Sequence, residues 1–254
     1  MEGVSPVLFA AIIVVGSLIA LVAAFSLVIS IWLAIKYVKF NRTPNSRGIT
    51  GSDAARIVLD KHGCENIKVS VVGSVLFGNS YSHYFKKIRL RRRTNKKESI
   101  SSLGMGVQKS ALAILDKEND PDMKRRVALI PITIFGPYAF IPILAIGVAI
   151  DFLVLDGTGI VSIIAAIIGI GFYVLSFVLS LSVLKTEKKA QERAYVILKE
   201  ESLATDEEIE MMKELFHLYN IQYVNDLIIA FLEVIYKILL LVAKIQANSS
   251  SNNN

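Results

Sequence analysis

The chain has 254 residues, of which 53% are hydrophobic and 20% are charged, and its formal net charge is +6. Its apolar residues come in long blocks without charge, which excludes an ordinary water-soluble globular protein and predicts a membrane protein. A single cysteine, Cys64, excludes an internal disulfide, so the sequence does not indicate an oxidising compartment.

Residues 1–40 are predicted to form an N-terminal transmembrane anchor. Val7 to Ile35 contains no charged residue, and as one helix it exceeds the roughly 30 Å hydrocarbon core of a bilayer. Trp32 and Tyr37, with the basic residues that follow Ile35, form an aromatic and basic edge. By the positive-inside rule this edge faces the cytoplasm, which leaves the amino terminus outside.

Residues 41–126 are predicted to form a small α+β cytoplasmic domain. They carry 18 Lys and Arg against 8 Asp and Glu, whereas residues 185–223 carry 6 against 9. Thr50 and Asp53 have capping-box spacing and open a helix that Gly63 ends. A local excess of positive charge beside a membrane predicts a polyanionic partner, and the nearest polyanion is the lipid surface.

The same domain contains two alternating segments and a buried helix. The alternation of apolar and polar residues predicts half-buried strands over 67–75 and 85–91, with a turn at 78–80 between them. Apolar residues with helical spacing then predict a buried helix over 101–115. Asn119-Asp120-Pro121 ends this helix.

Residues 127–184 are predicted to form a transmembrane helical hairpin. The two spans are 127–150 and 159–184, and the acidic loop 151–159 between them has no cation, as expected outside the cell. Pro131, Pro137 and Pro142 lie inside the first of these spans. Prolines are tolerated there only if neighbouring groups or bends satisfy the backbone carbonyls that they free.

Residues 185–220 are predicted to return to the cytoplasm as two helices, 190–201 and 206–219, the second opened by the capping-box spacing of Thr205 and Glu208.

Residues 221–246 are apolar but contain three charged residues that share one helical face, Asp226, Glu233 and Lys237. We favour the interpretation that this segment is a fourth transmembrane helix, with these charges facing a bundle interior or a wet cavity. The alternative is an interfacial or re-entrant helix. The polar tail, 247–254, is predicted to be disordered.

Four segments share the pattern of one family in the same order. They are Gly48–Asp60 (Gly-Ile-Thr-Gly-Ser-Asp-Ala-Ala-Arg-Ile-Val-Leu-Asp), Lys86–Leu90 (Lys-Lys-Ile-Arg-Leu), Ser99–Gly104 (Ser-Ile-Ser-Ser-Leu-Gly) and Lys185–Leu198. Through them the chain resembles the YugP-type membrane zinc metallopeptidases, the neutral zinc metallopeptidase family. The first segment of that family reads Gly-Leu-Thr-Gly-x-x-Ala-Ala-Arg-x-Ile-Leu-Asp. The resemblance covers nearly the whole chain, which is more specific than any single motif.

The chain departs from the family at the zinc-binding motif. The family carries His-Glu-x-x-His on a helix, where two histidines four residues apart bind one zinc ion and the glutamate acts as general base. In this chain Gln108 and Leu112 stand at the ligand positions and Lys109 stands at the position of the base. An amide oxygen binds zinc poorly, a leucine does not bind it, and a charged lysine cannot accept a proton.

A second motif is also altered. The family's Asp-His-Tyr-Asp segment appears here as Asn79, Ser80, Tyr81 and Ser82, so only the tyrosine remains. Glu187 aligns with the third zinc ligand of the family. The resemblance therefore implies a degenerate site in which Glu187 is paired with a nearby cation in place of a metal.

The expected partner of Glu187 is Lys109, with Lys188 and Arg193 next in line. The remaining histidines and the cysteine (His62, Cys64, His83 and His217) have no ligand spacing that would rebuild a metal site.

A run of eight cations within twelve residues suggests a binding surface. It consists of Lys86, Lys87, Arg89, Arg91, Arg92, Arg93, Lys96 and Lys97. With Ile88 and Leu90 facing inward, the residues that alternate with them would line the outward face of a strand. Such a face is either an edge strand protected by charge or a site for anionic headgroups. Nucleic acid is not expected, because no stacking aromatic residues interleave with the run.

These observations predict a mainly α, multi-pass membrane protein with three to four transmembrane helices and a small α+β cytoplasmic domain. We expect a catalytically inactive homologue of the zinc metallopeptidases, without a cofactor, although the family would bind zinc. Its expected role is that of a scaffold or adaptor for an unidentified membrane protein partner in the bacterial plasma membrane. The alternatives are an active zinc metallopeptidase with an unrecognised site and a module that binds anionic lipid.

Overall fold

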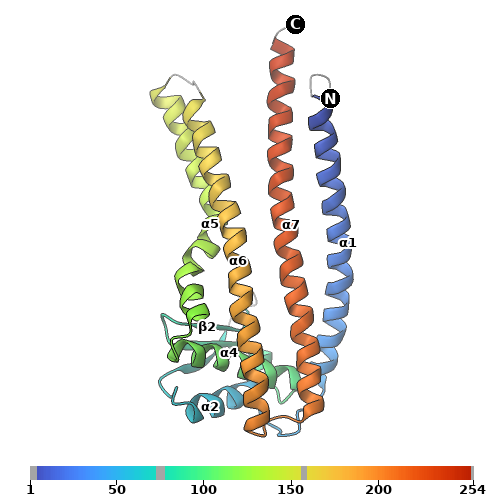
Figure 1. Cartoon of the computed structure of the whole chain (residues 1–254), viewed down its shortest axis with the longest axis vertical. Helices are drawn as coiled ribbons and strands as arrows, with labels where there is room; N and C mark the ends of the chain where they lie inside the picture. The colour runs from blue at the N-terminus through green and yellow to red at the C-terminus, as the bar shows by residue number, and fades with distance from the viewer. Residues whose placement is uncertain (1–4, 73–77, 156–158, 253–254) are drawn as a thin grey trace. The chain divides into compact units, whose positions relative to one another are not determined.

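The structure, a computed structural model, describes residues 5–72, 78–155 and 159–252 (Figure 1). It is 79% helical and contains one small three-stranded sheet. The elements in chain order are α1 (Pro6–Arg42), α2 (Gly51–Lys61), β1 (Lys68–Val72), β2 (Ser80–Ser82), β3 (Lys87–Arg91), α3 (Arg92–Lys96), α4 (Ile100–Lys117), α5 (Pro121–Val154), α6 (Ile160–Glu200) and α7 (Asp206–Asn252).

The chain divides into two compact units. One is formed by the terminal segments 1–34 and 218–254, and the other by residues 35–217. In the first unit α1 and α7 lie side by side and run in opposite directions (Figure 1). The backbone N–H of Ser5 donates to Oε1 of Gln246 at 3.2 Å, and the Gln222 amide donates to the Ser26 hydroxyl at 3.1 Å.

Helix α7 corrects two expectations about the C-terminal part of the chain. The helices predicted over 206–219 and 221–245 are one continuous helix, because nothing between them removes a backbone donor or requires a positive φ. The tail predicted to be disordered is helical up to Asn252, as the helical hydrogen bonding of the apolar turns continues into it. The capping box at its start is confirmed, since Thr205 and Glu208 exchange hydrogen bonds of 2.9 and 3.2 Å.

The second unit begins with the predicted α+β domain. Its first helix, α2, has the predicted capping box between Thr50 and Asp53, and Gly63, with φ of +64°, follows its end. The sheet has the order β1-β3-β2, with β1 parallel and β2 antiparallel to β3. The alternation predicted for β3 is confirmed: Ile88 and Leu90 are fully buried, and the residues that alternate with them are not.

Two short elements of this domain differ from the sequence expectation. Ser80 belongs to strand β2 rather than to a turn, because it pairs with Arg89 of β3. The five residues from Arg92 to Lys96 form a short helix, α3, that was not predicted. Residues 73–75 of the first predicted strand lie outside the described residues.

Helix α4 is the centre of the second unit. Every residue from Ile100 to Leu115 except Met105 is buried, which confirms the predicted buried helix. Glycines allow its backbone to approach its neighbours closely. A Cβ on Gly106 would lie 2.2 Å from the carbonyl oxygen of Gly51 on α2, and a Cβ on Gly51 would lie 2.3 Å from the carbonyl oxygen of Thr94, so neither position has room for a side chain.

Helices α5 and α6 pack against each other as an antiparallel pair (Figure 1). The carboxylate of Asp151, near the end of α5, accepts from the backbone N–H groups of Val161 and Ser162 at the start of α6. The Ser176 hydroxyl donates to the Ile132 carbonyl at 2.8 Å. Contrary to the expectation of a separate helix over 190–201, α6 continues without a break from its apolar segment to Glu200.

Among the residues that the structure describes, two helices, α1 and α6, are long and apolar enough to cross a membrane. The apolar part of α5, Ile141–Val154, is shorter. Helix α7 is not in this group, and Asp226, Glu233 and Lys237 are exposed rather than turned into a bundle interior. Lys237 and Glu233 approach each other to 3.9 Å on this exposed face.

Candidate functional site

The candidate site lies where α4 meets the beginning of α5 and the second half of α6. Glu187 on α6 is the central residue, and its side chain is only 21% exposed. Its Oε2 accepts hydrogen bonds from the Gln108 amide at 2.6 Å and from the Lys109 ammonium at 3.0 Å. Its Oε1 accepts a hydrogen bond from the Arg126 guanidinium at 2.9 Å. Two helices, α4 and α5, therefore contribute donors to one carboxylate on a third helix, α6.

The carboxylate of Glu187 is held in its charged form. Burial by itself would raise the pKa of Glu187, but the charges of Lys109 and Arg126 and the hydrogen bonds from Lys109 and Gln108 lower this pKa to about 2. Both cations are themselves shielded from solvent, with side chains 11% and 12% exposed. The cluster thus contains two positive charges around one negative charge in a site that is largely closed to water.

Ion pairs between α5 and α6 fix the approach of the three helices. The Lys185 ammonium contacts Asp122 at 2.9 Å, and the Thr186 hydroxyl donates to the Asp122 carbonyl at 3.1 Å. Lys189 pairs with Asp120, which also caps α5 by accepting from backbone N–H groups at its start. These contacts lie within two residues of Glu187 on either side, so they fix this part of α6 against the start of α5.

The prediction that Lys109 lies within salt-bridge reach of Glu187 is confirmed. Arg126 was not predicted to take part, although it supplies the second cation. Arg193, a candidate from the sequence, instead contacts Glu118 at 3.2 Å, and Lys188 is exposed.

Leu112, at the second ligand position of the family motif, is fully buried among the apolar residues of the core. A leucine at this position therefore serves the packing of α4. It has no group that a metal ion or a substrate could bind.

The altered Asp-His-Tyr-Asp segment consists of Asn79 and the whole of β2, and it has structural roles. The Asn79 amide donates to the Thr94 hydroxyl at 3.3 Å, and its carbonyl oxygen accepts from the backbone N–H of Arg91 at 2.7 Å. Ser80 pairs with β3, and the Ser82 hydroxyl accepts from the backbone N–H of Phe85 at 3.4 Å. These contacts shape β2 and the turn after it.

A second polar cluster surrounds Asp116, which sequence reasoning missed. Its carboxylate accepts from the Tyr81 hydroxyl at 2.5 Å, contacts His83 Nδ1 at 2.7 Å and pairs with the Lys86 ammonium at 2.8 Å. Burial would raise the pKa of Asp116, but the hydrogen bonds from Lys86, Tyr81 and His83 lower it. The sequence did contain a signal, because Asp116 is four residues beyond Leu112 and therefore on the same side of α4.

The residues at the Glu187 site do not fit a zinc ion. Zinc is held by several ligands that donate electron pairs, such as imidazole, thiolate or carboxylate. Here one carboxylate is surrounded by an amide and two cations that donate hydrogen bonds to it. Across the described residues, no group of three His, Cys, Asp or Glu side chains is placed to hold a metal ion.

The basic run divides into residues with different environments. Lys86 is paired with Asp116, and Lys97 donates to the Asn41 carbonyl at 2.7 Å. The guanidinium of Arg89 lies over the ring of Phe85 at 5.5 Å. Lys86 and Lys97 are nevertheless exposed, and Lys87 is half-buried. The other exposed cations of the run lie on the outward side of β3 and on α3: Arg89, Arg91, Arg92, Arg93 and Lys96.

The chain was compared with known protein families, curated proteins and solved structures. A family model described as "putative neutral zinc metallopeptidase" matches residues 14–242, which is most of the chain. Neither the curated proteins nor the solved structures contain a match to this chain.

Proposed function

The chain belongs to the neutral zinc metallopeptidase family, and on that premise we propose that it is a catalytically inactive member that acts as a membrane scaffold or adaptor. One observation carries the proposal: Glu187 is bound by Lys109 and Arg126. Two cations beside the carboxylate repel a metal ion, and neither can serve as a general base while it is protonated. The site keeps the contact between α4 and α6 without zinc chemistry.

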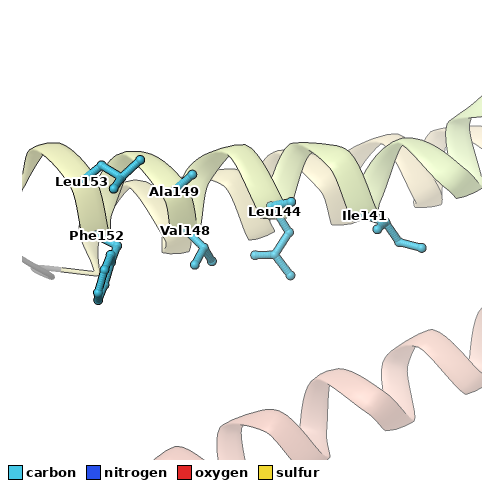
Figure 2. Close-up of a pocket in the computed structure, with 7 residues that line it drawn as sticks. Ile141, Leu144, Val148, Ala149, Phe152 and Leu153 are labelled. Carbon is cyan, nitrogen blue, oxygen red and sulfur yellow. The ribbon is translucent and has the colours of Figure 1, made fainter.

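The exposed apolar surface supports a membrane location for this scaffold. Large apolar side chains are exposed along α1, α5 and α6, including Val7, Phe152 and Leu153 at 78–81% exposure. Figure 2 shows side chains that line an apolar hollow along α5: Ile141, Leu144, Val148, Ala149, Phe152 and Leu153. Soluble monomers rarely expose apolar patches of this extent, whereas lipid-facing helices do. We propose that α1 and the α5–α6 pair cross the membrane. We propose α7 as a fourth span because it lies antiparallel beside α1, although it carries more charge than the helices that qualify by hydropathy.

Purified full-length protein is expected to contain no stoichiometric zinc and to cleave no peptide substrate. The reason is the donor set, in which Gln108, Lys109 and Leu112 replace two ligands and a base. Elemental analysis and a peptidase assay with and without chelator test this. The matched control is a triple variant with the motif restored (Gln108→His, Lys109→Glu and Leu112→His), which is expected to retain zinc. One zinc per chain in the unaltered protein, with chelator-sensitive proteolysis, would favour the alternative of an active enzyme with another site.

The topology is tested by labelling single cysteines in intact cells. In a Cys64→Ala background, Arg47→Cys is expected to react with an impermeant maleimide only after the cells are permeabilised, because residues 41–126 carry the excess of cations. Arg47 is preferred to Ser46, whose hydroxyl and N–H both donate to Glu208. The control, Thr158→Cys in the acidic loop, is expected to react in intact cells. The opposite pattern would refute the proposed orientation.

A further inference from the structure

The turn between β2 and β3 presents two adjacent aromatic side chains to the surroundings. Tyr84 is 64% exposed and Phe85 is 70% exposed. The turn itself is well defined, because Ser82 accepts from the backbone N–H of Phe85 and Lys86 adopts a positive φ of 42°. Two consecutive large aromatic residues that are exposed at a defined turn, and not used by the core, indicate a surface that contacts something outside the domain.

The turn contacts α5 through the Tyr84 hydroxyl. The Tyr84 hydroxyl lies 3.5 Å from the carbonyl oxygen of Val127. That carbonyl lacks its helical donor, because Pro131, four residues later, has no N–H group. Val127 also follows Arg126, after which α5 has no charged residue until Asp151. The turn therefore lies at the level where α5 changes from polar to apolar.

One cation contacts the Phe85 ring, and others lie nearby in the sequence of β3 and at the start of α5. Arg89 lies over the Phe85 ring at 5.5 Å, and Lys87 precedes it on the same outward side of β3. Lys124 and Arg125 are exposed on the first turns of α5. Aromatic rings with basic side chains beside them are typical of the boundary between hydrocarbon and water, where cations attract anionic headgroups.

We propose that the turn 83–86 is an interfacial anchor: the rings of Tyr84 and Phe85 lie in the headgroup layer, and Lys87 and Arg89 face anionic headgroups. This inference rests on the proposed crossing of the membrane by α5 and α6. It assigns the predicted contact with anionic headgroups to the cations next to the turn, and not to the whole run of eight. The anchor holds the domain that carries Lys109 against the bilayer surface.

The test uses tryptophan fluorescence of the full chain in lipid nanodiscs. Trp32 on α1 is the only native tryptophan. In a Trp32→Phe background, Phe85→Trp is compared with Val71→Trp, since Val71 is 46% exposed on β1 and pairs with Leu90, away from the turn. The discs contain lipids brominated near the headgroup, with or without phosphatidylglycerol as the anionic lipid.

The indole introduced at position 85 is expected to lose emission intensity to the brominated lipid and to emit at shorter wavelength, more strongly with phosphatidylglycerol present. The indole at position 71 is expected to show neither change. If the indole at position 85 shows the same intensity and wavelength behaviour as the indole at position 71, the anchor is overturned. A blue-shifted but unquenched indole would mean a protein partner covers the turn, which also overturns it. Equal quenching in both lipid mixtures would refute the anionic contact.

A measurement of Trp32 in the native chain distinguishes a failure of the anchor from a failure of the proposed membrane location. Trp32 is expected to be quenched by the same lipids, because it lies near the end of the apolar part of α1. If Trp32 is quenched and position 85 is not, the anchor fails while membrane insertion stands. If neither is quenched, the proposed membrane location fails and the anchor fails with it.

Discussion

Replacing Glu187 with glutamine is expected to lower the free energy of unfolding by about 3–5 kcal/mol, because it leaves two shielded cations without a counter-charge. Lys109 and Arg126 contact the two oxygens at 3.0 and 2.9 Å, and both side chains are nearly buried. Glutamine has the same shape, so the loss measures charge and not packing. Denaturant unfolding of the detergent-solubilised chain, followed by circular dichroism, measures the difference.

The matched control is Glu118→Gln. Glu118 pairs with Arg193 at 3.2 Å, but both side chains are well exposed. Its removal is expected to change the free energy of unfolding by less than about 1 kcal/mol, because solvent screens exposed pairs. Equal effects of the two substitutions would mean that the Glu187 cluster is screened by water, contrary to the structure.

The same cluster predicts a pH dependence with a definite sign. The pKa of Glu187 is about 2 in the folded chain, below the ordinary value of 4.5. The unfolded chain therefore binds this proton more readily. The contribution of Glu187 to the free energy of unfolding is fully present above about pH 4.5 and is lost as the pH falls toward about 2. The difference in unfolding free energy between the unaltered chain and Glu187→Gln is expected to shrink over this range. A difference that stays constant would contradict the depressed pKa.

Gly106→Ala is expected to destabilise the second unit by about 2 kcal/mol, although alanine is the better helix former. The added Cβ would lie 2.2 Å from the Gly51 carbonyl oxygen, and this neighbour is backbone rather than a flexible side chain. Helices α2 and α4 would have to move apart, which disturbs a core that contains Val107 and Ala111. A lowered midpoint of thermal unfolding, measured by circular dichroism, would show this.

Gly171→Ala is the control for this substitution, because a Cβ at Gly171 on α6 meets nothing within 4 Å. It is expected to leave the midpoint unchanged or to raise it slightly. If both alanine variants behave alike, the close approach of α2 and α4 is not required for stability.

Local signals in the sequence predicted the parts of the fold that depend on neighbouring residues. The cap at Thr50, the alternation around Ile88 and the buried helix over 101–115 each follow from short patterns, and the structure has all three. The meeting of Lys109 and Glu187 was predicted from the order of segments in the family that the chain resembles, not from spacing. That prediction required knowledge of how distant segments pack.

Features that depend on tertiary contacts were missed. Arg126 reaches Glu187 from 61 residues away, and a long side chain at a helix start gives no sequence signal of its direction. Strand β2 is three residues long and exists through pairing with β3, so no alternation could reveal it. The continuity of α6 and α7 was missed because changes from apolar to charged composition were interpreted as helix ends, although composition alone does not end a helix.

The unbroken course of α6 has a mechanical consequence. From Ile160 to Glu187 the helix extends about 40 Å as a single rod. In the proposed membrane setting, its apolar turns adjust their inclination to the thickness of the surrounding bilayer. Because the rod has no joint, that adjustment is carried along its axis to the cluster at Lys109 and Arg126. Glu187 is on that rod, so its ion pairs with Lys109 and Arg126 are the contacts on which such a change of inclination would act.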